Sequence, residues 1–453
     1  MIRQDVIVAQ ATSTGIAGVS IVRLSGPDQS IIKLIDVLSL VKADEIKPRY
    51  AYFTTFLDSN KDHLDEGILL YFKAPHSFTG ESVLELQCHG GLVVSKLLIK
   101  ACLCLGARMA DPGEFSMRAV LNQKMTTLKA EAILGVVHAQ DEAQARAAIR
   151  SMQGDFADRV HVIAQKLKHV RVMIESIIDF DDESDVEAIV SVADLMDVFH
   201  LVQQLRQQAT MSVQLSQDQQ ICLIGPPNAG KSSWMNRLME QEAAIVSPQA
   251  GTTRDLVEKR VMIADRWVLV TDTAGLRQSS DDIEQQGVQK AKEKTKSVDV
   301  SIWVVDVESL DELSALSEDL PDSPIKQADR YLILWNKRDL KGRKVEKLFW
   351  HDVPVYTVTA HEEKDVDFVR TLIADKLDQP EPDLFYARDR HLRALTMIEE
   401  KLSGVINYAK VDFDVVWVAE CMREIQDELD KLVGLFSTED LLGEIFGSFC
   451  IGK

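Results

Sequence analysis

The sequence predicts a multidomain protein, with an α+β domain first, then an all-α helical domain into which an α/β domain is inserted. Three observations support this fold class. The 453 residues are too many for one hydrophobic core. Near Leu121 short apolar runs give way to long Ala- and Gln-rich stretches, and between Asp218 and Leu377 strand-like runs alternate with helices. The predicted domains are therefore residues 1–121, 122–217, 218–377 and 378–453, of which the second and fourth form the helical domain.

The first domain combines predicted strands with a predicted helix. Apolar runs bounded by Gly and Pro predict strands at Val19–Leu24, Gly67–Phe72 and Val83–Cys88. The longer stretch Leu92–Leu105 has helical periodicity.

Long helices are expected on both sides of the insert, and strands within it. The helical segments are Leu128–Gln153, Phe156–Ile178, Val186–Leu215, Arg388–Tyr408 and Val415–Leu435. The strand-like runs of the insert are Ile221–Ile224, Val257–Ile263, Trp267–Thr271, Val300–Asp306, Tyr331–Trp335 and Val355–Val358.

Composition favours a cytoplasmic protein without a membrane anchor. We find no run of about eighteen apolar residues and no basic-then-apolar N-terminal signal. The net charge of −20 means that any contact with RNA would use local basic patches. The six cysteines lack CxxC spacing and nearby histidines, which argues against a zinc site or a disulfide framework.

A phosphate-binding loop is predicted after the first strand of the insert. Gly225 and Gly230 let the backbone curve around a triphosphate, with its amides facing the oxygens. Lys231 reaches the β and γ phosphates, and Ser232 ligates Mg²⁺ at the start of the next helix. The residues expected to bind the nucleotide here are Asn228, Ala229, Gly230, Lys231, Ser232 and Ser233.

Two later segments complete the predicted phosphate site. Thr253 lies in a loop that can close over the γ phosphate and Mg²⁺. Asp272 ends a strand, where it can hold Mg²⁺ through water, and the amide of Gly275 can meet the γ phosphate. The neighbours that we include as nucleotide-binding are Gly251, Thr252, Thr273 and Ala274.

The segment from Asn336 to Asp339 has the Asn-Lys-x-Asp pattern that selects guanine. Asp339 can accept hydrogen bonds from N1–H and the 2-amino group of guanine, which adenine does not offer. Asn336 and Lys337 complete the pattern, while Thr359 and Ala360 are expected beside the base. The insert is therefore predicted to be a Ras-like P-loop G domain that binds GTP.

The position after the Asp-x-x-Gly segment departs from the familiar small GTPases. Leu276 stands where a Gln usually orients the attacking water, so hydrolysis must be arranged differently. Glu284 is either a carboxylate that acts on this water or an ordinary surface acid. Asn228 can ligate a monovalent cation that takes the place of an arginine finger.

Several segments together resemble the MnmE (TrmE) family of tRNA-modification GTPases, and the resemblance covers essentially the whole chain. These segments are Val8–Thr12, Ser77–Glu81, Gly251–Asp255, Asp272–Arg277, Thr438–Phe446 and the C-terminal Phe449–Lys453, which ends in Cys-Ile-Gly-Lys.

The resemblance implies a homodimer whose N-terminal domain binds a tetrahydrofolate, such as 5-formyltetrahydrofolate, and whose GTP hydrolysis is stimulated by potassium. By this resemblance the potassium ligands are Asn228, Ser247, Gln249 and Thr252, and the magnesium ligands are Ser232 and Thr253. The catalytic residues are Glu284, Lys231 and Thr253. The folate contacts are Arg23, Glu85, Lys124 and Lys453.

The resemblance also implies a partner and a product. Such proteins work with the FAD protein MnmG, in a heterotetramer or larger complex. Together they install an aminomethyl or carboxymethylaminomethyl group at C5 of the wobble uridine of certain tRNAs. The tetrahydrofolate supplies the one-carbon unit.

The residues alone leave alternatives open. Arg23, Glu85 and Lys124 could be ordinary surface or paired charges. Cys450 could be a reactive thiol or an incidental cysteine of the tail. Two other functions are a ribosome-assembly GTPase, which would need an RNA-binding appendage, and a nucleotide switch that binds a partner without taking part in chemistry.

Overall fold

The computed structural model divides the chain into two compact units. One comprises Met1–Val137, Ala148–Ala209 and Phe385–Lys453, and the other His138–Ala147 and Thr210–Leu384. The domain boundaries expected from the sequence stay a prediction. The residues that the structure describes are 5–42, 44–179, 192–215, 217–239, 257–264, 266–272, 298–317, 320, 324–325, 328–377, 383–409, 414–434, 445–447, 449 and 452.

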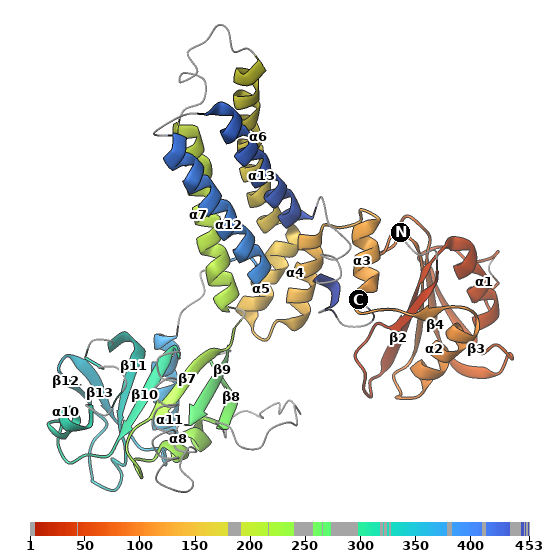
Figure 1. Cartoon of the computed structure of the whole chain (residues 1–453). Coiled ribbons are helices and arrows are strands. Elements are labelled where there is room, and N and C mark those ends of the chain that lie inside the picture. Colours follow the sequence, from red (N-terminus) through yellow and green to blue (C-terminus); the bar gives the residue numbers. More distant parts are fainter. Residues whose placement is uncertain are drawn as a thin grey trace, which may run out of the picture. The chain divides into compact units, whose positions relative to one another are not determined.

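A six-stranded sheet forms the centre of the N-terminal domain (Figure 1). Its neighbours are antiparallel except for the parallel pair at one edge. In spatial order the strands are β3 (Ala51–Leu57), β4 (His63–Phe72), β5 (Ser82–His89), β2 (Val19–Gly26), β1 (Ile7–Gln10) and β6 (Arg108–Met109).

Helices cover the two faces of this sheet unequally. Alternating strand residues pack with α1 (Asp28–Leu38) and α2 (Val94–Cys104) in one hydrophobic core. On the opposite face Phe115 of α3 (Glu114–Leu121) packs on Ile7 and Ala9. Successive side chains of a strand point to opposite faces, so residues two apart in β2, such as Arg23 and Ile21, share this second face.

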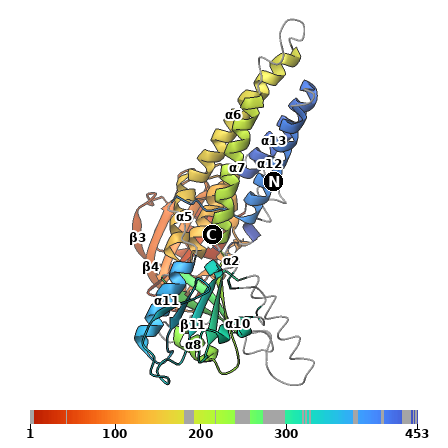
Figure 2. The same cartoon turned by 90° about the vertical axis from the view of Figure 1, so that its left-hand side faces the viewer.

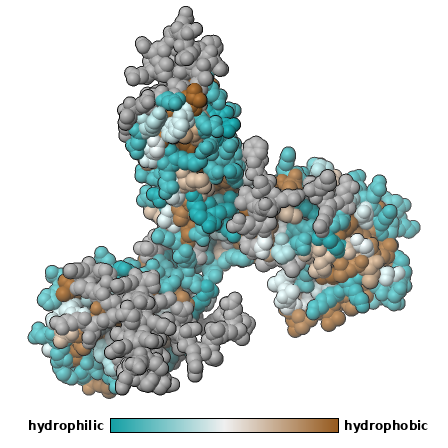
Figure 3. Space-filling model, in the orientation of Figure 1, coloured by the Kyte–Doolittle hydropathy of each residue, from teal (hydrophilic) through white to brown (hydrophobic). Residues whose placement is uncertain are grey.

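The second face of the sheet leaves large apolar side chains exposed. Val19, Phe53 and Ile68 are 53%, 76% and 38% exposed. Phe53 and Ile68 are paired across β3 and β4, so their side chains lie together. Figure 3 shows apolar surface on this domain.

The helical domain is built on four long helices that run side by side (Figures 1 and 2). They are α6 (Asp155–Asp179), α7 (Val192–Leu215), α12 (Asp389–Ala409) and α13 (Val415–Val433), and they share one hydrophobic core. The shorter α4 (Thr127–His138) and α5 (Glu142–Gln153) precede them. Within the described ranges, each helix is too short or too polar to cross a lipid bilayer.

Two of the predicted helices differ from those observed. The segment Leu128–Gln153 forms two helices rather than one, because the side chain of Asp141 accepts a hydrogen bond from the backbone N–H of Gln144 at 2.8 Å and begins α5. The last long helix ends at Val433, where Gly434 adopts φ 84° and caps it.

The insert has a seven-stranded sheet with helices on both faces. The order is β12 (Lys347–Trp350), β13 (Val353–Thr357), β11 (Tyr331–Trp335), β10 (Val300–Val305), β7 (Gln219–Ile224), β9 (Arg266–Asp272) and β8 (Val257–Ile263). Only the two pairs at the edges, β8 with β9 and β12 with β13, are antiparallel.

Helices pack on both faces of the insert's sheet, and the nucleotide motifs lie at one edge of this sheet. The helices α8 (Lys231–Met239) and α11 (Glu363–Lys376) pack on one face, and α10 (Glu312–Ser317) packs on the other. A short 3₁₀ helix, η3 (Ala328–Arg330), precedes β11. The carboxyl ends of β7, β10 and β11 meet at the same edge, where open α/β sheets bind ligands. The predicted fold class is confirmed.

Candidate functional site

The predicted phosphate loop joins β7 to α8, and its two glycines are required by close contacts. Gly225 has φ 135°, and a Cβ there would lie 2.0 Å from the carbonyl oxygen of Val304. Gly230 has φ 99°, and its Cβ would lie 2.2 Å from Nδ2 of Asn336. Both conformations strain any other residue. The loop therefore lies directly against β10 and the guanine-recognition segment.

Lys231 lies across this loop. Its ammonium group donates to the carbonyl oxygens of Gly225 at 2.9 Å and Pro226 at 2.8 Å, and the residue is buried. A positive charge is thus held over the loop, where the loop amides and the N-terminus of α8 also favour an anion. This arrangement suits the β and γ phosphates of a nucleotide.

The residues predicted to ligate cations in the phosphate loop are accessible. Asn228 is exposed and adopts the left-handed conformation, with φ 59°. Ser232 and Ser233 are exposed in the first turn of α8. Amide and hydroxyl oxygens are suitable ligands for hard cations. Asn228 therefore fits a potassium ligand and Ser232 a magnesium ligand.

Asn336 joins the phosphate loop to the guanine motif, a role that the sequence alone did not reveal. Its Nδ2 donates to the carbonyl oxygen of Ala229 at 2.7 Å, and its Oδ1 accepts from Nε1 of Trp234 at 3.0 Å. All three residues are buried. Both polar atoms of the Asn336 side chain therefore have a hydrogen-bond partner.

Asp339 is exposed at the end of the guanine motif and available to a base. The Thr359 hydroxyl hydrogen-bonds its carboxylate and lowers the pKa of Asp339 below its ordinary value. The group is therefore an ionised acceptor at neutral pH, as recognition of guanine requires.

Further contacts hold the loop beside the base. The carboxylate of Asp365 accepts from the backbone N–H of Thr359 and from Nε of Arg338, both at 2.7 Å. Nε of Arg237 donates to the carbonyl oxygen of Ala360 at 3.1 Å. The predicted base-edge residues are thus fixed by both neighbouring helices.

Lys337 pairs with a carboxylate that sequence reasoning did not single out. Its Nζ lies 2.9 Å from Asp306, directly after β10, and Lys341 contacts the same carboxylate at 2.8 Å. Although burial raises the pKa of Asp306, hydrogen bonds from the two lysines lower it overall. Asp306 therefore fixes Lys337 at the end of β11.

The side chains of the remaining predicted nucleotide and potassium residues, and the end of the tail, lie outside the described part of the structure. Asp272 ends β9 beside Leu223, and only its backbone position is described. The residues that lie outside the described ranges are Ser247, Gln249, Gly251, Thr252, Thr253, Thr273, Ala274, Gly275, Leu276, Glu284, Cys450 and Lys453.

The structure brings together Arg23 and Glu85, two of the candidate folate residues. They are paired across β2 and β5, with Nε of Arg23 2.9 Å from Oε1 of Glu85. The guanidinium carbon of Arg23 lies 5.8 Å from the ring centre of Phe78 and 5.9 Å from that of Phe115. The same contacts also agree with the alternative interpretation, in which Arg23 and Glu85 form a structural salt bridge that packs between two aromatic rings.

Lys124 and the C-terminal tail lie near the same part of the domain. A Cβ on Gly80 would lie 3.2 Å from Cε of Lys124, so this side chain runs along the loop that carries Phe78. A Cβ on Gly452 would lie 2.2 Å from the carbonyl oxygen of Gln10, at the end of β1. The last described residue of the tail thus contacts the strand that neighbours β2.

Two buried charge clusters were also missed by sequence reasoning. One surrounds Arg118 in the N-terminal domain, and the other surrounds Glu131 in the helical domain. Their members are far apart in the chain, so only the spacing of Glu114 and Arg118 on one helix could have indicated either cluster.

Comparison with known proteins agrees with this organisation. Residues 6–124 match the family model described as GTP-binding protein TrmE N-terminus, and residues 128–450 match the model of the MnmE helical domain. Three relatives that carry the name tRNA modification GTPase MnmE align over nearly their full length. The protein of Acinetobacter baumannii (strain AYE) is 38% identical over 457 residues, which cover 99% of each chain.

The other two relatives align as fully. The protein of Dichelobacter nodosus is 37% identical over 463 residues and covered completely, as is this chain. That of Acinetobacter baylyi is 39% identical over 455 residues, which cover 99% of this chain and 97% of the relative. With identity at this level and two matching family models, this chain belongs to the MnmE family and is a GTP hydrolase.

Proposed function

We propose that this GTPase is stimulated by potassium and that, with the flavoprotein MnmG, it installs an aminomethyl or carboxymethylaminomethyl group at C5 of the wobble uridine of certain tRNAs. The observation that carries the proposal is the match to tRNA modification GTPases along the whole chain. The site supports the GTPase part, because Asn336 connects the phosphate loop with the guanine motif.

In the proposed hydrolysis reaction, residues of the insert bind and orient GTP. Lys231 neutralises the β and γ phosphates, and Asp339 selects guanine. Ser232 and Thr253 are the proposed magnesium ligands, and Glu284 the residue that orients the attacking water. The proposed nucleotide contacts also include Gly251, Asp272, Thr273, Ala274 and Gly275.

Potassium is proposed to bind beside the phosphates through Asn228, with Ser247, Gln249 and Thr252 as further ligands. When bound, it would supply the positive charge that an arginine finger supplies in other GTPases. Asn228 is exposed in the phosphate loop, which supports this role.

A tetrahydrofolate is proposed as the one-carbon donor, bound at the N-terminal domain. Arg23 and Glu85 lie side by side there, Lys124 runs along the neighbouring loop, and Lys453 ends the tail that reaches β1. A guanidinium and an ammonium group suit the carboxylates of a folate. Phe78, which lies near Arg23 and is 37% exposed, offers a ring against which a planar ring system could pack.

The proposed assembly is a cytoplasmic homodimer that joins MnmG and a tRNA. The exposed apolar side chains of Val19, Phe53 and Ile68 on the open face of the N-terminal sheet support association of two copies through this domain. The domain boundaries at residues 121, 217 and 377 belong to the same proposal.

Replacing sodium by potassium should accelerate GTP hydrolysis and tRNA modification together. In a reconstituted reaction with MnmG, tRNA and 5-formyltetrahydrofolate-derived donor, we expect turnover in KCl to exceed that in NaCl by about a hundredfold, the usual contribution of one electrostatic group at a transition state. Turnover is measured as phosphate release and as modified uridine.

The variant Asn228→Ala should lose this preference for potassium while still binding GTP. Equal rates in the two salts for the wild-type protein would contradict the potassium role. Full modification by a Glu284→Ala protein that no longer hydrolyses GTP would instead favour a nucleotide switch over the proposed coupling.

A further inference from the structure

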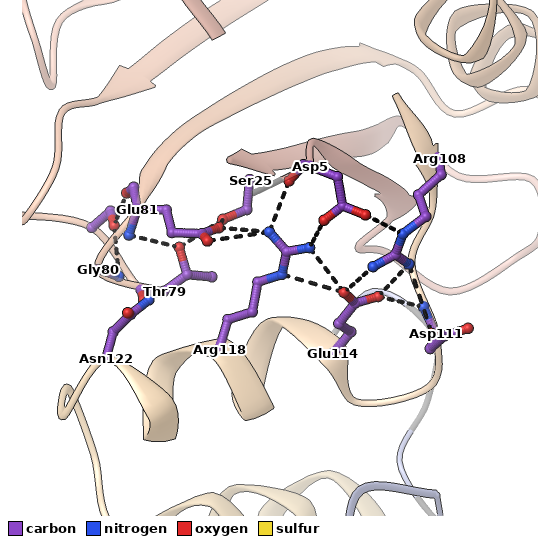
Figure 4. Close-up of polar contacts among 11 residues, drawn as sticks. Asp5, Ser25, Thr79, Gly80, Glu81, Arg108, Asp111, Glu114, Arg118 and Asn122 are labelled. Carbon is purple, nitrogen blue, oxygen red and sulfur yellow. Dashed lines mark hydrogen bonds and ion pairs between the residues drawn. The ribbon is translucent and has the colours of Figure 1, made fainter. Parts of the chain in front are cut away.

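A buried network of charges connects helix α3 with the sheet and with the loop that follows β4 (Figure 4). We call it the Arg118 network. It consists of Asp5, Glu81, Arg108, Glu114 and Arg118. The side chains of Arg118 and Glu114 are 3% and 4% exposed. Charges so deeply buried must be closely paired, and the positions of their partners are therefore restricted.

One end of the network is the junction of α3 with β1 and β6. Nη2 of Arg118 lies 2.7 Å from Oδ1 of Asp5 and 2.9 Å from Oε1 of Glu114. Arg108 contacts the same two carboxylates, Asp5 at 2.6 Å and Glu114 at 2.5 Å. Although burial raises the pKa of Glu114, hydrogen bonds from the two arginines lower it overall. This end is thus held by both arginines.

The other end is the loop at residues 77–81, and of the two arginines only Arg118 is paired with it in the described structure. Nη1 of Arg118 donates to the carboxylate of Glu81, with distances of 3.2 and 3.0 Å to its two oxygens. Ser25 donates to the same carboxylate at 2.7 Å. Because the guanidinium group is planar and its donors are fixed, it sets the position of Glu81 relative to α3 and β1.

Three further contacts carry this restraint along the loop. The hydroxyl groups of Ser25 and Thr79 lie 2.7 Å apart, and Nδ2 of Asn122 donates to the carbonyl oxygen of Thr79 at 2.7 Å. The backbone N–H of Glu81 donates to the Thr79 hydroxyl at 3.2 Å. Figure 4 shows Ser25, Thr79 and Asn122 around the loop end of the network. Phe78 directly precedes Thr79, whose hydroxyl and carbonyl groups these contacts hold.

This loop forms one wall of the proposed folate site. Phe78 faces the guanidinium group of Arg23 at 5.8 Å, and Lys124 runs along Gly80. Arg118 itself is buried behind the loop and contacts neither Arg23 nor Glu85 among the bonds and ion pairs of the described residues. Its influence on a ligand would therefore pass through Glu81 and the loop.

We propose that Arg118 is a positioning residue, which holds the loop at residues 77–81 so that Phe78 and Gly80 form the wall of the folate site beside Arg23 and Lys124. The proposal rests on the proposed binding of a tetrahydrofolate by this domain. Arg108 stabilises the other end of the same network and leaves the loop in place.

The two arginines provide a matched pair of variants. Arg118→Lys keeps the charge but loses the planar donors, so it can no longer hold Glu81 and Asp5 together. We expect the dissociation constant for 5-formyltetrahydrofolate, measured by calorimetric titration of the full-length protein, to rise about tenfold, because a loop that occupies the binding position only about a tenth of the time weakens binding by that factor. Arg108→Lys should lower the melting temperature but leave this constant within about twofold.

Hydrogen exchange of the ligand-free protein separates positioning from general destabilisation. The amides of residues 77–82 should exchange faster in Arg118→Lys than in Arg108→Lys. Equal effects of the two variants on the loop and on binding would overturn the proposal. If Arg118→Lys does not fold, Ser25→Ala removes the contacts to Glu81 and Thr79, and unchanged exchange of the loop in that variant would overturn the proposal as well.

The controls distinguish this inference from the proposed function. Failure of the wild-type protein to bind 5-formyltetrahydrofolate would contradict folate binding, whereas the exchange comparison would still decide whether Arg118 positions the loop. Arg23→Ala serves as a variant of the binding site itself. It should weaken binding without changing the exchange of residues 77–82.

Discussion

Asp339→Asn will change the nucleotide preference of the protein from GTP to XTP. The asparagine amide cannot accept from both N1–H and the 2-amino group of guanine, but it can accept from N1–H of xanthine and donate to its 2-oxygen. We expect GTP affinity to fall by about a thousandfold, because a site built to pair with a donor rejects a mismatched partner strongly. Competitive titration of GTP and XTP measures the change.

A surface variant of the same chemical kind is the control for this prediction. Asp375 is exposed on α11, so Asp375→Asn should leave both affinities within about twofold. The melting temperature of Asp339→Asn should also remain close to that of the wild type, since Asp339 is exposed. An unchanged ratio of GTP to XTP affinity in Asp339→Asn would remove Asp339 from guanine recognition.

Glu131→Ala will strongly destabilise the helical domain. Glu131 of α4 is fully buried and pairs with Arg390, with His391 at 2.8 Å and with Arg388 at 3.3 Å. These partners lie at the start of α12, where the chain leaves the insert. Removing the carboxylate takes a buried acceptor away from the groups that face it, which costs about 3 to 5 kcal/mol. Chemical unfolding followed by circular dichroism, which reports helix loss, measures this change.

Glu142→Ala is the matched control for the Glu131 variant. Glu142 also pairs with an arginine, Arg146, but both side chains are about two-thirds exposed to solvent. Such a pair contributes only about 0.5 kcal/mol. An equal loss of stability in the two variants would contradict the importance of the buried cluster.

The same cluster predicts a loss of stability in acid. Although burial raises the pKa of Glu131, His391 and Arg390 lower it to about 2, from an ordinary value of 4.5. The contribution of the Glu131 carboxylate to the free energy of unfolding is therefore fully present above pH 4.5 and is lost as the pH falls toward 2. Burial lowers the pKa of His391 below its ordinary 6.5, so acidification below that value also favours the unfolded state. The denaturant concentration at the unfolding midpoint should therefore decrease below pH 6.5, and decrease again between pH 4.5 and about 2.

Several strands of the insert could be predicted from the sequence. Val257–Ile263 and Tyr331–Trp335 were predicted with their observed bounds. The edge strand β12 was missed because only Trp350 of its residues is buried, and β3 because its first half, Ala51–Phe53, has no buried residue. These two edge strands have few buried apolar residues from which to recognise them, whereas the edge strand β8 was predicted.

The site was predictable where its chemistry lies within one short segment. The phosphate loop carries two glycines and a lysine at fixed spacing, and the guanine motif carries an asparagine, a lysine and an acid. The structure places both at one edge of the sheet. The contact of Asn336 with Ala229 and that of Arg118 with Glu81 join residues distant in the chain. Such pairings depend on tertiary structure, which a single sequence does not display.

The most direct test of the central claim is mass spectrometry of the wobble-uridine nucleosides of tRNA from cells that lack this protein. The account predicts loss of the aminomethyl and carboxymethylaminomethyl products, restored by the wild-type chain. Lys231→Ala, which should not bind the phosphates productively, should fail to restore them. Normal levels of these nucleosides in the deleted cells would contradict the account.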